Sequence, residues 1–119
     1  PDPTIVAASN ENRGSVRYVN CSLREPHNQI AKVGGGTVGF SDCTFLQWDR
    51  EKEGRHAIQA MGGSLIVRGC EFRTDAPQVS LTKDVKRAVI TGNLFNGSAR
   101  IADAGAGNVQ IGLNSATED

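Results

Sequence analysis

The sequence repeats one ten-residue phrase three times. "GSVRYVNCSL" begins at residue 14, "GTVGFSDCTF" at residue 36 and "GSLIVRGCEF" at residue 63. Superposing the three cysteines brings two more lines into register, "AVITGNLF" and "VQIGLN", which place an asparagine at the cysteine position. The shared position is thus occupied by Cys21, Cys43, Cys70, Asn93 and Asn114, with spacings of 22, 27, 23 and 21 residues. The chain therefore contains five units of about 22 residues with one insertion, a spacing typical of repeat folds.

Apolar residues alternate along the stretch before each shared position, which is the pattern of a strand with one buried face. The inward set is Val16 and Tyr18, Val38 and Phe40, Leu65 and Val67, Ala88 and Ile90, and Val109 and Ile111. Apolar residues return two positions after the shared residue, at Leu23, Phe45, Phe72 and Phe95. Three short strands per unit, with no helical pattern between them, favour coiling over hairpins. The sequence predicts an all-β parallel β-helix, a β-solenoid of about five coils, as a single domain over residues 1–119.

The residue before the shared position tolerates a left-handed backbone, as a sharp bend between strands requires. It is Asn20, Asp42, Gly69 or Gly92 in the first four units. The resulting motifs "VNCSL", "SDCTF", "RGCEF" and "TGNLF" resemble the corner motif of right-handed parallel β-helix proteins, the pectate-lyase-like superfamily. The resemblance covers residues 15–114 and implies a right-handed coil.

The resemblance implies a fold more than an activity, because that superfamily contains lyases, hydrolases, epimerases, phage tailspikes and proteins without known chemistry. Its pectate lyases carry an Arg-x-Pro-x-x-Arg segment, and its polygalacturonases carry Asn-Thr-Asp, Asp-Asp and Gly-His-Gly segments. The sequence contains none of these in complete form. No catalytic role is therefore carried over from either family.

The cysteines are expected to be reduced core residues. Neighbours in a ladder have Cβ atoms about 4.8 Å apart, whereas a disulfide prefers about 3.8 Å. A ladder does not converge on a point, so no zinc site is expected. Asn93 and Asn114 continue the column, and we expect backbone groups at the bends to satisfy them.

The balance of positive and negative residues limits the classes of partner that the chain is expected to bind. Thirteen Lys and Arg residues face thirteen Asp and Glu residues, so the chain lacks the basic surface of a nucleic-acid binder. No apolar run approaches the roughly 20 residues of a membrane span. The sequence predicts neither nucleic acid nor a membrane span.

The insertion "LQWDREKEGRHA", residues 46–57, is the candidate functional loop, because loops on a rigid solenoid often carry function. An aromatic ring beside charged groups is typical of sugar recognition, with Trp48 as the platform and Arg50 and Arg55 as partners for hydroxyls or uronate carboxylates. The alternative is structural: Trp48 covers the coil as a lid, and the charges keep the loop soluble. The functional interpretation predicts an extracellular or cell-surface module that binds or processes polysaccharide.

Counting from the shared position predicts one polar rim over three coils. Its members are Glu25, His27, Trp48, Asp49 and Asp75. Carboxylates on adjacent coils approach within about 5 Å, which suits a retaining glycosidase pair or a shared calcium ion. Like charges at that distance raise one pKa, as a general acid requires.

Should the chain be an enzyme, the expected reaction is glycan cleavage by a polysaccharide lyase or a glycoside hydrolase. Asp49 and Asp75 then supply the carboxylates. Arg50 or His56 serves as the charged partner, and Glu25 and His27 join the residues that contact the sugar.

Neither end of the sequence shows the pattern of a capping helix, although solenoids normally need caps. Two explanations stay open. The chain is the C-terminal part of a longer β-helix, or its ends pair with further copies of itself to build a filament.

Overall fold

The structure is a computed structural model that describes residues 6–25 and 28–117 of the 119-residue chain. These residues form fifteen short strands and no helix, so they contain no helix long and apolar enough to cross a membrane. The strands build three five-stranded sheets, and every strand pair is parallel. The all-β, parallel fold predicted from the repeat is confirmed.

Each of the five coils gives one strand to each sheet. Sheet A contains β1 (Val6–Ala8), β4 (Ala31–Val33), β7 (Ile58–Ala60), β10 (Val79–Leu81) and β13 (Ile101–Asp103). Sheet B contains β2 (Ser15–Val19), β5 (Thr37–Ser41), β8 (Gly63–Arg68), β11 (Val85–Thr91) and β14 (Asn108–Gly112). Sheet C contains β3 (Ser22–Glu25), β6 (Thr44–Trp48), β9 (Glu71–Phe72), β12 (Leu94–Phe95) and β15 (Ser115–Ala116).

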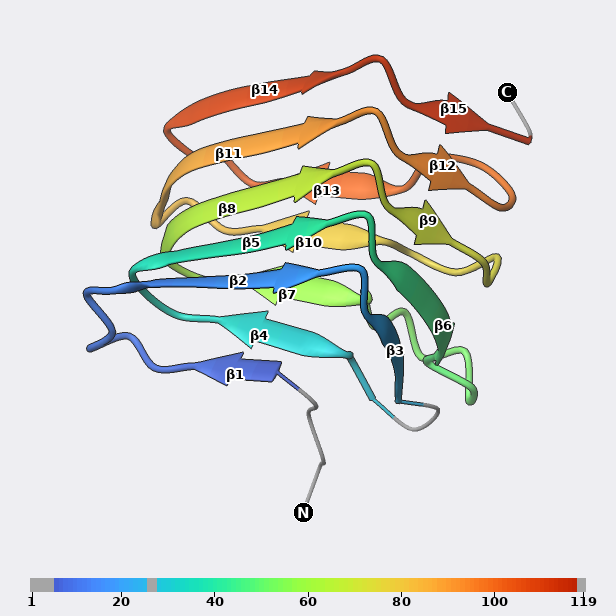
Figure 1. Ribbon diagram of the computed structural model, residues 1–119, viewed down its shortest axis with the longest axis horizontal. Coiled ribbons are helices and arrows are strands. Elements are labelled where there is room, and N and C mark those ends of the chain that lie inside the picture. The colour runs from blue at the N-terminus through green and yellow to red at the C-terminus, as the bar shows by residue number, and fades with distance from the viewer. Residues whose placement is uncertain (1–5, 26–27, 118–119) are drawn as a thin grey trace.

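The chain winds as a solenoid with its axis running from the first coil to the last. In Figure 1, sheet B runs from left to right at the front and sheet A runs back behind it while the chain climbs from the N- to the C-terminal coil. This is the right-handed sense that parallel crossovers adopt.

Like residues lie above one another inside the coil. Phe40 is in register with Tyr18 below and Val67 above. In sheet C the rings of Phe45 and Phe72 stack with centroids 4.6 Å apart and an interplanar angle of 5°. The inward set chosen from alternation is therefore buried in the three middle coils, whereas Val16 and Ile111 in the two end coils remain exposed.

The bend between sheets B and C uses a left-handed residue in every coil. Asn20, Asp42, Gly69 and Gly92 have φ between 55° and 69°, as predicted. The fifth bend places Leu113 in the same conformation, at φ 58°. A leucine there is strained, because its Cβ approaches the following carbonyl oxygen.

The shared corner residues form one polar column. The thiols of Cys43 and Cys70 donate to the carbonyls of Tyr18 and Phe40, one coil earlier, at 3.3 and 3.5 Å. The Asn114 side-chain amide makes the equivalent bond to Ile90 O at 3.2 Å. All three cysteines are free thiols, and the bend backbone satisfies the asparagines as expected.

Candidate functional site

The insertion encloses a hollow of about 600 Å³ on the outside of the solenoid. We call it the loop hollow. Three successive coils supply its walls: the insertion, the turn after β9, and Arg100 before β13. Its lining residues are Gln47, Trp48, Asp49, Arg50, Lys52, Gly54, Thr74, Asp75, Ala76, Pro77 and Arg100.

A β-bulge sets the start of the insertion. Arg24 pairs with Leu46 and Glu25 pairs with Trp48, so Gln47 is the extra residue. Gln47 has φ 50°, and its N–H donates to the Thr74 hydroxyl of the next coil at 2.7 Å. The bulge turns Trp48 inward against the core, because one extra residue reverses the side-chain alternation.

Trp48 is a core residue that borders the hollow. Its side chain is 1% exposed, and its indole N–H donates to Pro77 O at 2.6 Å. The ring meets Phe72 edge to face, with centroids 6.0 Å apart. This burial favours the lid interpretation over an open stacking platform for a sugar ring.

Asp49 organises the loop that follows. Its buried carboxylate accepts the N–H groups of Glu53 and Gly54, both at 2.9 Å. Its own carbonyl accepts the N–H of Lys52 at 2.9 Å. The loop thereby turns around one side chain and leaves Arg50 and Lys52 exposed at the mouth of the hollow.

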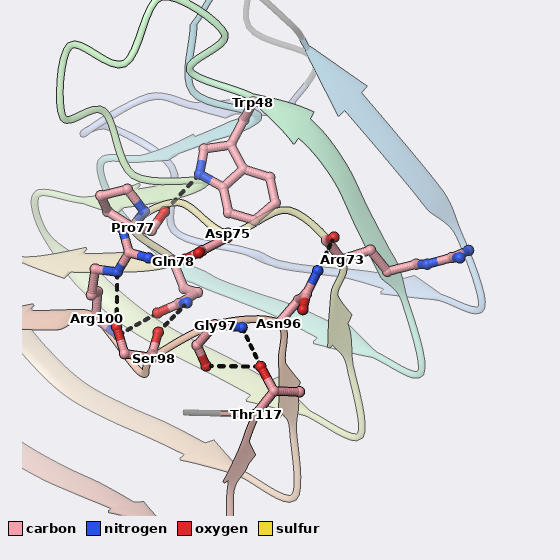
Figure 2. Close-up of polar contacts among 10 residues, drawn as sticks. All are labelled: Trp48, Arg73, Asp75, Pro77, Gln78, Asn96, Gly97, Ser98, Arg100 and Thr117. Atoms are coloured by element: carbon pink, nitrogen blue, oxygen red, sulfur yellow. Dashed lines mark hydrogen bonds and ion pairs between the residues drawn. The ribbon is translucent and has the colours of Figure 1, made fainter. Parts of the chain in front are cut away.

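Asp75 and Arg100 form an ion pair between adjacent coils (Figure 2). Both side chains are partly exposed. The Arg100 Nε group also donates to the Ser98 hydroxyl at 3.2 Å, which directs the guanidinium toward Asp75. Gly97 has φ 89°, a conformation that other residues rarely adopt, and a Cβ there would also meet the Asp75 carboxylate, so this position favours glycine.

Gln78 fixes the turn that carries Arg100. It is buried, and its side-chain NH2 group donates to Ser98 O at 3.0 Å. Its side-chain oxygen, Oε1, accepts the backbone N–H of Arg100 (Figure 2). One glutamine therefore holds both ends of a short turn on the next coil. Because the buried amide forms both hydrogen bonds, it holds the turn in one conformation.

The charged side chains that line the loop hollow differ in whether another group of the protein already binds them. Three cations line it: Arg50, Lys52 and Arg100. Of its two carboxylates, Asp49 is occupied by backbone N–H groups and Asp75 by Arg100. Because the ion pair also takes up the charge of Arg100, the positive charge offered to a ligand comes mainly from Arg50 and Lys52, whose donors suit hydroxyl-rich or anionic ligands.

The other predicted site residues lie elsewhere. Arg55 and His56 line a separate hollow of about 200 Å³, where Arg55 pairs with Glu53 at 2.7 Å. Burial lowers the pKa of His56 from 6.5, and the nearby Asp49 carboxylate acts in the opposite direction. Glu25 is buried below Trp48, and His27 lies outside the described residues. The structure thus brings Trp48, Asp49, Arg50 and Asp75 together and separates Arg55 and His56 from them.

Sequence reasoning missed Arg100 and Gln78. Both occupy the position directly before a sheet A strand, which in other coils holds buried Ile30 and Ala57. A polar residue at an otherwise apolar position of a repeat is the signal that identifies them.

Asp49 accepts hydrogen bonds from backbone N–H groups, whereas Asp75 forms an ion pair with Arg100. Among residues 6–25 and 28–117, no three His, Cys, Asp or Glu side chains come together in a group able to hold a metal ion. The partners of Asp49 and Asp75 therefore do not suit the calcium site considered for the rim.

Searches against family models, curated proteins and solved structures found no match for this chain. The parallel β-solenoid is established by its own strand pairing, and the likeness to the pectate-lyase-like superfamily is carried by the corner motifs alone.

Proposed function

We propose that the chain is a polysaccharide-binding module of the pectate-lyase-like superfamily that acts outside the cell or at its surface. The loop hollow is the binding site, and a sugar chain with carboxylate groups is its ligand. The observation that carries the proposal is that the exposed cations Arg50 and Lys52 line a solvent-open hollow of about 600 Å³.

The size and chemistry of the hollow support this ligand class. Ligand sites typically occupy about 300–1,000 Å³ and contain a few convergent polar groups. Guanidinium groups bind carboxylates with paired hydrogen bonds, and a lysine adds a compact positive charge. Thr74 and Gln47 contribute polar groups for sugar hydroxyls at the same wall.

Binding is supported better than cleavage, because both candidate carboxylates already have partners in the folded chain. Cleavage by Asp49 and Asp75 is a separate hypothesis. It requires turnover on a glycan, and unchanged turnover after Asp49→Asn with Asp75→Asn would reject it.

The binding proposal is tested by NMR titration of the chain with a galacturonate tetramer, and with a neutral glucose tetramer for comparison. We expect the acidic sugar to shift the amide signals of Arg50, Lys52 and Thr74. Arg50→Gln with Lys52→Gln should weaken binding at least about tenfold, since loss of about 1.4 kcal/mol has that effect. Added salt should weaken it further.

The matched control is Lys83→Gln with Arg87→Gln, which removes the same charge at exposed positions away from the loop hollow. Equal weakening in the control would show attraction by net charge alone and refute the site. Shifts that avoid the insertion would refute it as well.

A further inference from the structure

The two end coils leave the core columns open. In the column shared by Phe40, Val67 and Ile90, the inner members are fully buried, whereas Ile111 in the last described coil is 47% exposed. At the opposite end, Val16 is 39% exposed although Val38, its neighbour above, is buried. Both end faces therefore present apolar side chains that the other coils cover.

Each end face also presents three strand edges. The strands β1, β2 and β3 form one edge of sheets A, B and C, and β13, β14 and β15 form the opposite edge. Strand edges carry backbone groups that can pair with further strands. A single extended peptide covers one edge, whereas a complete end face requires three parallel strands in a fixed arrangement.

We propose that the last coil of one copy docks head to tail on the first coil of a second copy, so that the stack of coils continues across the junction. A second copy fits because its first coil is built from the same repeat as the coils already stacked. This property is independent of saccharide binding at the loop hollow.

The internal register specifies the contacts at the junction. Continuing it places Ile111 against Tyr18, Val109 against Val16, and Ala116 against Leu23 of the next copy. Within the chain, the Tyr18 ring already stacks on Phe40 with centroids 5.4 Å apart. The junction thus repeats a kind of packing that the molecule uses between its own coils.

The corner column continues in the same way. Each corner side chain from Cys43 onward donates to a carbonyl one coil earlier, as Cys43 does to Tyr18 O at 3.3 Å and Asn93 to Val67 O at 3.1 Å. In the stack, the Cys21 thiol takes the same place relative to Ile111 O of the preceding copy. The thiol is only partly buried in the single chain, so it is accessible for this contact.

The end faces are also compatible in charge. The described part of the first coil carries three arginines, Arg13, Arg17 and Arg24, with Glu11 as its exposed acidic residue. The described last coil carries Asp103 and also Arg100, which is paired with Asp75 of the coil before it. The last coil therefore has no excess of positive charge to repel the arginines of the first coil, and repulsion does not oppose docking. A head-to-tail contact that continues the solenoid axis does not close into a ring, so repetition builds a filament.

The test is sedimentation velocity of the chain over roughly 1 μM to 1 mM, the range in which modest interfaces associate. The wild type should sediment faster as its concentration rises. Val16→Lys and Ile111→Lys each place a charge on one end face and should each remain monomeric. Their folding is checked by circular dichroism and thermal melting.

Mixing the two variants is the decisive experiment. Ile111→Lys retains an intact first coil, and Val16→Lys retains an intact last coil, so the mixture should form dimers and nothing longer. The matched control is Val89→Lys, which changes a 38% exposed valine on the outer face of β11 and should leave association unchanged.

Three results overturn the proposal. They are a wild type that stays monomeric, variants that associate like the wild type, or a mixture of the two variants that contains no dimer. A monomeric wild type would leave the end faces to coils of a longer polypeptide.

Discussion

Asn93 and Asn114 lie one above the other in the corner column, and the side-chain amide of Asn93 donates to Oδ1 of Asn114 at 3.0 Å. Asn93 is buried, donates to Val67 O at 3.1 Å, and accepts the N–H of Cys70 at 2.8 Å. One side chain therefore satisfies backbone groups of the coil below and contacts the coil above.

Asn93→Ala should destabilise the fold by about 3 kcal/mol, because it leaves the buried Cys70 N–H and Val67 carbonyl without this partner. Chemical denaturation measures the change. Asn93→Cys is the matched variant, since the first three coils carry cysteine at this position. It retains a donor toward Val67 O and should lose less. An alanine variant as stable as the wild type would show that these bonds contribute little.

Leu113 is a second residue whose substitution should change the stability of the fold. It has φ 58° and is 92% exposed, so it combines a strained backbone with little packing. Leu113→Gly should stabilise the chain by about 1 kcal/mol, because glycine adopts this conformation freely. That gain corresponds to a rise in Tm of about 4 °C. Leu113→Ala keeps the strain while removing the apolar side chain, so an equal rise for alanine would exclude strain relief as the cause.

The columns of the core could be predicted from sequence because the repeat and its alternation specify them residue by residue. Val38, Phe40, Leu65 and Val67 are buried as the pattern requires. The left-handed bends were also predictable wherever Gly, Asn or Asp marks them. At Leu113 the side chain gives no such signal, and only its place directly before the shared residue Asn114 indicates the conformation.

The candidate site was less predictable, because loops depend on contacts between coils that no local pattern contains. The bulge at Gln47 turned Trp48 inward, and the Asp49 carboxylate was taken up by its own loop. The insertion was predicted as the candidate functional loop, and the structure places a hollow beside it. The pairing of Asp75 with Arg100 depends on how the turns of two coils lie against each other, which spacing does not specify.

Asp49 should prove to be the residue that orders the insertion. Asp49→Ala removes the acceptor for the N–H groups of Glu53 and Gly54 and also places alanine at φ 54°. We expect a loss of about 1–2 kcal/mol and faster hydrogen exchange at both amides. Asp49→Asn tolerates the left-handed backbone and retains one acceptor, so its effect should be smaller. Unchanged exchange in the alanine variant would contradict this role.

The three thiols should react at very different rates. Burial raises the pKa of Cys43 and raises that of Cys70 to about 11, so both thiols stay protonated and shielded at neutral pH. Cys21 is partly exposed. Timed alkylation at pH 8 followed by mass spectrometry should label Cys21 first, because the thiolate is the reactive form. Comparable labelling of Cys70 in the folded chain would contradict the buried column.

Cys70 also links stability to alkaline pH. Its pKa in the folded state, about 11, is above the ordinary value of 9.0, so the folded state retains a proton that the unfolded state releases. Its contribution to stability is complete below about pH 9 and is lost as the pH rises toward 11. Cys70→Ala should flatten the fall in Tm over this range, although its stability at pH 7 will be lower.

Protonation of His56 should lower the stability of the fold at acidic pH. Burial lowers its pKa below 6.5 in the folded state, while the Asp49 carboxylate partly restores it. The unfolded chain therefore binds a proton more readily, and the stability supported by neutral His56 is complete above about pH 6.5 and declines as the pH falls. His56→Gln should reduce the loss of Tm between pH 7 and pH 5. In an NMR titration, His56 should titrate below 6.5, and Asp49→Asn should move that pKa lower still because it removes the opposing charge. A rise of the His56 pKa in Asp49→Asn would show that the carboxylate does not act on the imidazole through its charge.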